Sequence, residues 1–144
     1  MNIYFACSIT GGRQDEAVYQ QIVEALLMDG HEVPTAILAD PDVVRLEGVV
    51  RPVEVYERDV AWIRGCDLLV AELSTPSHGV GYEIAYALNL SKPVLCLHHK
   101  KVKVSKMITG NRDPNLSIHI YSTPDEAVRI VLGHIASMKT KGLQ

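Results

Sequence analysis

The sequence predicts an α/β fold, a flavodoxin- or Rossmann-like sandwich in which helices cover both faces of a five-stranded parallel sheet. Short runs rich in β-branched and other apolar residues alternate with longer stretches in which apolar residues recur at helical spacing. The chain is 144 residues long and 47% hydrophobic, which suffices for one ordinary core. We therefore expect a single domain over residues 1–144.

The first half of the chain contains two of the expected strands. Residues 2–7 are apolar and run into two glycines, so we expect a buried first strand. Residues 15–29 carry apolar side chains at helical spacing, and residues 31–38 read as the second strand. Prolines and a glycine within residues 39–52 indicate a loop with short helical turns, which leads into a helix over residues 53–64.

The second half contains the strongest strand of the chain. Residues 67–73 (DLLVAEL) form an apolar run, and the small residues of 74–81 indicate a turn before a helix that starts near Tyr82. A polar loop covers residues 100–114. Two further strands and a helix opened by Thr-Pro-Asp-Glu complete the prediction, at residues 93–98, 116–121 and 123–138.

Charge and composition exclude several function classes. The chain has 14 basic and 17 acidic residues, so it lacks the basic footprint of a protein that binds a nucleic acid polymer. No run reaches the roughly 18 apolar residues of a membrane helix. Three cysteines without CxxC spacing indicate neither a disulfide framework nor a zinc site. The N-terminus lacks the basic region of a signal peptide, so we expect a cytoplasmic protein, and we expect no metal or organic cofactor.

Two loops are suited to a phosphate group. Ligands of doubly wound sheets bind beyond the carboxyl ends of the strands, where we expect residues 8–13, 74–81 and 98–114. The first two loops are rich in glycine and hydroxyl groups and precede helices, whose N-terminal N–H groups attract anions. The spacing matches neither GxGxxG nor the P-loop. The pattern therefore favours a phosphate-bearing ligand and disfavours the common dinucleotide and nucleoside triphosphate sites.

Two carboxylates are candidates for glycosidic chemistry. Glu83 follows Gly79-Val80-Gly81-Tyr82 and is expected in the first turn of its helix, where the helix dipole keeps a carboxylate ionised. Asp59 lies in the middle of the preceding helix, next to an arginine. Such a pair can cleave a glycosidic bond, because one group attacks or stabilises the sugar while the other assists the leaving group and then activates water. The sequence leaves open whether they face each other.

Four motifs of the chain resemble one family of enzymes. They are YFACSITGGR, ERDVAWIRGCDLLVAELSTPSHGVGYEIAYAL, PVLCL and VSKMITG. In these motifs the chain is similar to the 2′-deoxynucleoside 5′-monophosphate N-hydrolases, relatives of the nucleoside 2-deoxyribosyltransferases. The resemblance implies release of a free base and 2-deoxyribose 5-phosphate. It makes Glu83 the nucleophile at C1′ and Asp59 the group that orients or protonates the base and then assists water. Tyr4 would hydrogen-bond the catalytic carboxylate and crowd the 2′ side of the sugar, which favours deoxyribonucleotides.

The resemblance also implies which residues surround the nucleotide. The 5′-phosphate would be bound through the glycine-rich and hydroxyl-rich loops, by Ser8, Gly11, Ser77 and Gly79. The base would lie between Ile9 and Met107. Ser105 matches a serine that the family contributes from a neighbouring subunit, which implies a homodimer with composite sites.

Two positions depart from the family pattern. Thr10 stands where the animal hydrolases have an arginine, so one charged phosphate contact is missing. Arg13 or a lysine of residues 100–106 would have to replace it. Cys7 stands where a glycine is expected, which alters the loop beside the sugar.

Three other functions remain open at this stage. A nucleoside 2-deoxyribosyltransferase would form the same glycosyl-enzyme and pass it to another base. A ribonucleotide N-glycosidase acting on CMP is a second alternative, which Tyr4 disfavours. The third is a nucleotide-binding module without catalysis, against which the presence of both Glu83 and Asp59 argues.

Overall fold

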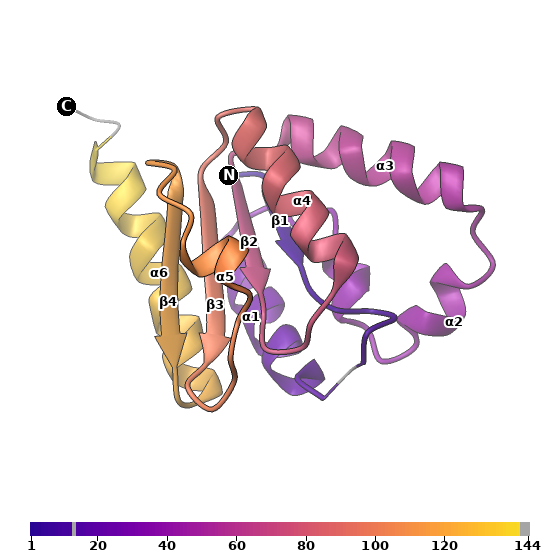
Figure 1. The fold of residues 1–144 in the computed structure, drawn as a ribbon, viewed down its shortest axis with the longest axis horizontal. Coiled ribbons are helices and arrows are strands. Elements are labelled where there is room, and N and C mark those ends of the chain that lie inside the picture. Colours follow the sequence, from indigo (N-terminus) through magenta and orange to yellow (C-terminus); the bar gives the residue numbers. More distant parts are fainter. Residues whose placement is uncertain (13, 142–144) are drawn as a thin grey trace.

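The computed structural model describes residues 1–12 and 14–141, in which four strands form one parallel sheet (Figure 1). The strands follow one another across the sheet in chain order, and the helices between them make the crossovers that parallel pairing requires. Their bounds are β1 (Ile3–Ala6), β2 (Leu68–Glu72), β3 (Val94–His99) and β4 (Leu116–Tyr121).

Helices cover both faces of the sheet. One face packs against α1 (Glu16–Met28) and α6 (Pro124–Lys141), and the other packs against α3 (Pro52–Gly65) and α4 (His78–Asn89) (Figure 1). Three short elements lie in the connections, namely η1 (Ala36–Ala39), α2 (Val43–Glu47) and α5 (Lys106–Thr109). Among the described residues, no helix combines the length and the apolar character needed to cross a membrane.

Alternating side chains of the strands point into two separate cores. In β1, Ile3 and Phe5 pack with α1 and α6, whereas Tyr4 and Ala6 pack with α3 and α4. Every residue of β1 and β2 is buried, which explains why these strands are continuous apolar runs in the sequence. The alternation places the phenol of Tyr4 beneath the two helices that carry the candidate carboxylates.

The expected second strand is wrong, and the sheet has four strands over the described residues where five were predicted. The segment at 31–38 makes one parallel bridge, between Glu32 and Asn2, and then turns into η1. Pro34 has no N–H for a ladder, and the backbone N–H of Phe5 donates to Oγ1 of Thr35 at 2.8 Å. The bridge still lies next to β1, on the side away from β2, as the second strand does in the flavodoxin-like order.

The other predicted strands and helices are confirmed apart from small shifts at their ends, except at the start of α4. This helix begins at His78, four residues before the expected start near Tyr82. Ser77 is its N-cap, and Ser77 Oγ accepts a hydrogen bond from the backbone N–H of Val80 at 3.3 Å. Gly79 and the next glycine therefore lie within the helix, and Glu83 is in its second turn, not in the first as expected.

Candidate active site

Tyr4 and Glu83 form a direct contact at the carboxyl edge of the sheet. The phenol of Tyr4, fully buried in β1, donates a hydrogen bond to Oε1 of Glu83 at 2.7 Å. Burial raises the pKa of Glu83 to about 7, the Tyr4 hydrogen bond opposes that rise, and the charge of Asp59 adds to it. Burial and the neighbouring carboxylates also raise the pKa of Tyr4, so the phenol stays protonated and remains a donor.

Asp59 shares the electrostatic environment of this pair. It lies on α3 with its side chain 17% exposed, and its Oδ1 accepts a hydrogen bond from Nε of Arg58 at 2.8 Å. Burial raises the pKa of Asp59, and the hydrogen bond and positive charge of Arg58 oppose that rise. Because the charge of Asp59 raises the pKa values of both Tyr4 and Glu83, the structure brings together the two carboxylates that the sequence could only name separately.

These three groups are suited to acid–base and nucleophilic chemistry near neutral pH. A carboxylate with a pKa of about 7 is ionised in a large fraction of molecules at that pH and is still basic enough to react. A second carboxyl group beside it can donate a proton to a leaving group and accept one from water. The phenol fixes one oxygen of Glu83 and leaves the other for a ligand.

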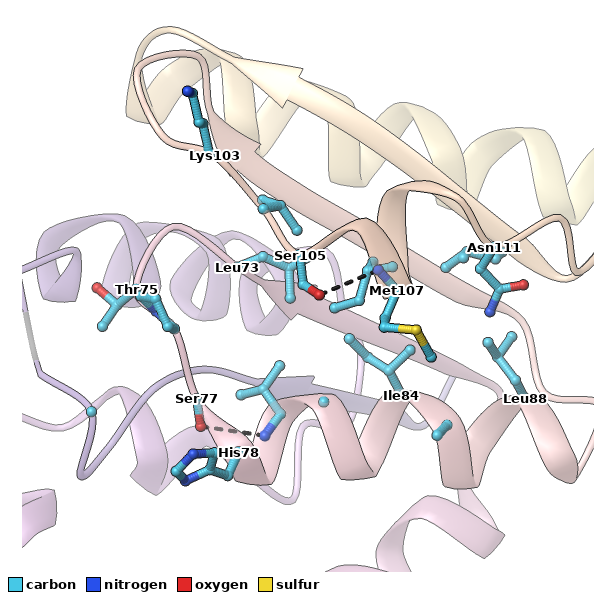
Figure 2. A pocket seen from close by; sticks show the side chains of 18 of the residues that line it. Leu73, Thr75, Ser77, His78, Ile84, Leu88, Lys103, Ser105, Met107 and Asn111 are labelled. Atoms are coloured by element: carbon cyan, nitrogen blue, oxygen red, sulfur yellow. Dashed lines mark hydrogen bonds between the residues drawn. The ribbon is translucent and has the colours of Figure 1, made fainter.

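A cleft of about 680 Å³ lies on the other flank of α4, between α4 and α5 (Figure 2). Its polar end contains Thr75, Ser77 and His78 at the start of α4, together with Lys103 from the loop after β3. Ile84 and the rest of the far end are mostly apolar. Hydroxyl groups beside a helix N-terminus form an environment suited to an anion.

The loops after β1 and β2 meet closely at this polar end. A Cβ on Gly11 would overlap the carbonyl oxygen of Pro76, so the position requires glycine. Gly12 has a φ of +126°, which side chains rarely adopt. The glycine pair therefore allows the loop at residues 8–12 to lie against the loop that carries Ser77, and both border the cleft, as expected for loops at this edge of the sheet.

The structure divides the expected nucleotide-binding residues into two groups. The cleft is lined by Gly11, Ser77, Ser105 and Met107, together with Thr10, the position at which the resemblance to the animal hydrolases implies an arginine. Three others lie elsewhere. Ser8 is buried beneath the loop, Ile9 packs against the core on the α1 side, and Gly79 is in the first turn of α4. Arg13 lies outside the described residues.

The position of α4 separates the cleft from the candidate catalytic groups. The helix lies between α3 and α5 (Figure 1), and Glu83 contacts β1 on the α3 side. The cleft is on the α5 side, where Ser105 and Met107 line it and Met107 is 85% exposed. Within one chain, Ser105 and Glu83 therefore lie on opposite flanks of the same helix.

A buried polar network beneath this edge was missed by the sequence reasoning. Oε1 of Glu72 accepts hydrogen bonds from the hydroxyl of Ser74 and from the phenol of Tyr121, the latter at 2.9 Å. Ser74 Oγ accepts in turn from the backbone N–H of His99 at 2.8 Å. The network thus links the ends of β2, β3 and β4, and burial raises the pKa of Glu72 to about 7. The available signal was a glutamate inside an otherwise apolar strand run.

Two carboxylates and a buried phenol lie close together near the carboxyl edge of the sheet, an arrangement suited to cleavage of an N-glycosidic bond. The nucleoside 2-deoxyribosyltransferase family matches residues 3–136, and the chain belongs to this family. The family membership that the sequence motifs indicated is confirmed.

Relatives from archaea and animals extend this result. Proteins named 2′-deoxynucleoside 5′-phosphate N-hydrolase 1 are 38% identical over 137 residues in Methanosarcina mazei and 42% identical over 130 residues in Thermofilum pendens. The match covers 95% of this chain and 85% of the Methanosarcina protein. For the Thermofilum protein it covers 89% of this chain and 90% of the relative. The 5-hydroxymethyl-dUMP N-hydrolase of Mus musculus is 38% identical over 135 residues, covering 91% of this chain and 77% of the mouse protein.

A solved structure supports the fold. The CMP N-glycosidase of Clostridium botulinum superposes with a TM-score of 0.70 at 21% identity, over 92% of this chain and 98% of the other. At this identity the likeness concerns the architecture alone.

Proposed function

We propose that the protein hydrolyses the N-glycosidic bond of 2′-deoxynucleoside 5′-monophosphates, releasing a free base and 2-deoxyribose 5-phosphate. The observation that carries the proposal is the arrangement of Tyr4, Glu83 and Asp59 around one buried edge of the sheet. Relatives that match most of this chain are named for hydrolysis of deoxynucleotides, which supports the same substrate class here.

The roles of these groups follow from their chemistry. Ionised Glu83 attacks C1′ with the oxygen that Tyr4 leaves free, so a C–O bond forms while the bond from C1′ to the base nitrogen breaks. Asp59, whose pKa is raised by burial, gives its proton to the departing base nitrogen and becomes a carboxylate. A water then gives its proton to Asp59 and its oxygen to C1′, which releases the sugar phosphate and restores Glu83. The phenol of Tyr4 also occupies space beside the sugar, which disfavours a 2′-hydroxyl.

The 5′-phosphate is proposed to bind at the N-terminal end of α4. Ser77 offers a hydroxyl there, and the glycine loop at residues 8–12 offers backbone N–H groups. Thr10 supplies no charge at this end of the cleft. Of the lysines in residues 100–106, Lys103 lines the cleft, and we assign the compensating positive charge to it.

We further propose that the active site is completed by a second copy of the chain. Ser105 and Met107 lie on the α5 flank of α4, whereas Glu83 faces the α3 flank, so in one chain they serve different sides of the helix. A two-fold dimer would bring Ser105 and the exposed Met107 of one chain to the Glu83 side of the partner.

A base-release assay tests the proposed reaction. The protein is incubated with a panel of deoxynucleoside 5′-monophosphates, the matching ribonucleotides and unphosphorylated deoxynucleosides, each with and without an acceptor base, and the products are separated by chromatography. Release of base from the deoxynucleotides alone is the expected result. Base exchange from unphosphorylated deoxynucleosides would instead identify a transferase, and release from CMP would identify a ribonucleotide glycosidase. Tight nucleotide binding without any cleavage would identify a binding module.

A further inference from the structure

A chain of charged groups leads from the short helix α2 to the carboxylate of Asp59. The guanidinium of Arg58 donates two parallel hydrogen bonds to Glu47, the last residue of α2, at 2.9 and 3.0 Å. Its third nitrogen, Nε, donates to Oδ1 of Asp59 at 2.8 Å. The Arg58 side chain is 26% exposed and that of Glu47 is 14% exposed, so water screens this pair less than a surface ion pair.

The guanidinium is held on three sides. Glu47 occupies the fork of the two terminal nitrogens, Asp59 engages Nε, and the ring of Trp62 lies beneath the planar group, with its centroid 4.8 Å from the central carbon of the guanidinium. Trp62 is one helical turn after Arg58, so α3 itself presents the stacking surface. A bidentate and stacked guanidinium has little freedom to rotate, and lysine cannot reproduce its geometry.

This arrangement determines what Asp59 can offer to a ligand. Within the described part of the chain, the hydrogen bond from Arg58 to Oδ1 is the one that this carboxylate makes, so Oδ2 remains available. The charged neighbours act in opposite senses. Arg58 lowers the pKa of Asp59 against the larger raising effect of burial, whereas Glu47 adds to that rise. Across the site, Asp59 faces Glu83 on α4 and the protonated phenol of Tyr4 on β1.

We propose that Arg58 and Glu47 are positioning residues that orient the Asp59 carboxylate and set its protonation for the two proton transfers of the reaction. The inference rests on the proposed role of Asp59 and adds a connection that reaches outside the site: the short helix α2, beyond the β1 edge of the sheet (Figure 1), is coupled to catalysis through one ion pair. Arg58 and Glu47 need not touch the substrate.

Two single substitutions with opposite electrostatic effects test the inference. Arg58→Gln removes the positive charge beside Asp59, so the carboxyl ¹³C titration of Asp59 in the free protein should move to higher pH. Glu47→Gln removes a negative charge and should move the same titration to lower pH. The resonance is assigned by its loss in Asp59→Asn. This readout requires no turnover, so it is independent of the proposed function.

Kinetics then connect the titration to catalysis, with the deoxynucleoside 5′-monophosphate that is cleaved fastest as substrate. We expect Arg58→Gln to lower kcat about tenfold while KM changes less than about twofold, since the loss concerns proton transfer more than binding. The limb of the pH profile that belongs to Asp59 should shift in the same direction as the titration. Arg58→Lys restores the charge, so the limb should return to its wild-type pH, whereas kcat should recover only in part.

The matched control is Arg51→Gln. Arg51 pairs with Glu54 at 2.6 Å at the start of the same helix, but this pair is exposed and does not contact Asp59. This variant should leave kcat, the pH limbs and the Asp59 titration unchanged. Urea unfolding of each variant separates an effect on folding from an effect on the site.

Several outcomes would overturn the inference. An Asp59 titration that does not move in Arg58→Gln contradicts it, and so does an equal loss of kcat when Arg58→Gln is added to Asp59→Asn, because a residue that acts through Asp59 should cost nothing further there. Wild-type turnover by Asp59→Asn would instead refute the proposed function of Asp59. If Asp59→Asn is impaired and Arg58→Gln is not, the proposed function survives and only the positioning role fails.

Discussion

Replacing Glu83 by glutamine should abolish turnover and, above neutral pH, make the protein more stable. Glutamine is neutral and keeps an oxygen that can accept the hydrogen bond from Tyr4. Wild-type Glu83 must be ionised above its pKa in a site where burial opposes ionisation. The pKa is raised from 4.5 to about 7 in the folded protein, which corresponds to an unfavourable free energy of about 3 kcal/mol.

The sign of the effect follows from the proton balance. Below about pH 4.5 the carboxyl group is protonated in both states, so it contributes no difference. Between pH 4.5 and 7 the unfolded chain releases this proton while the folded protein retains it, and wild-type stability falls as the pH rises. Glu83→Gln lacks this loss. Its gain in the free energy of unfolding should therefore grow across that window and level off at about 3 kcal/mol above pH 7.

Urea unfolding followed by circular dichroism, at several pH values between 4.5 and 8 and at equal protein concentration, measures this difference. Glu54→Gln is the control, because Glu54 is exposed and its pKa is lowered by hydrogen bonds from Arg51, so the substitution offers no stabilisation. A gain that does not change with pH, or no gain at pH 8, would refute the electrostatic reasoning. Near wild-type base release by Glu83→Gln would refute its role as nucleophile.

Three further substitutions test neighbouring parts of the site. Tyr4→Phe removes the hydrogen bond that lowers the pKa of Glu83, so the acidic limb of the kcat/KM profile should move to higher pH, and an unmoved limb would contradict that role. Ser77→Asp keeps an N-cap, so stability in urea should hold, but its charge should lower kcat/KM for deoxynucleotides about a hundredfold through repulsion of the phosphate. Equal effects on unphosphorylated deoxynucleosides would argue against phosphate at that end. At pH 5, where Glu72 is protonated, Glu72→Ala leaves the hydroxyls of Tyr121 and Ser74 without their acceptor and should lower the free energy of unfolding by about 2 to 4 kcal/mol, whereas exposed Glu57→Ala should not.

Local pattern determined most of the fold. The strands β1, β2 and β3 are buried on both faces or nearly so, and burial of a parallel strand leaves a continuous apolar run that is legible in one sequence, whereas β4 is partly exposed. The helices could be placed because their buried side chains recur with the helical period, as in α1 and α3. The start of α4 was misplaced, because the glycines that read as a turn follow an effective N-cap at Ser77 and lie in the helix.

The fifth strand illustrates where local pattern fails. Its residues have strand-like composition, but Pro34 cannot donate to a ladder and the Thr35 hydroxyl accepts from Phe5 N–H in place of a backbone carbonyl. Whether such a segment pairs depends on the partner strand, which lies about thirty residues away in the chain and is fixed only in the folded protein.

The sequence by itself determined the α/β architecture. Residue type and short-range spacing also named the phosphate-suited loops, Glu83 and Asp59 as candidates, and the resemblance to the family added Tyr4. Only the tertiary structure decided which of these groups meet. It brought Tyr4 against Glu83 across the interior, set Ser105 on the other flank of α4, and joined Glu47 to Asp59 through Arg58. Contacts of this kind depend on how separate elements pack, and neither periodicity nor composition records the direction in which a side chain on one element meets another.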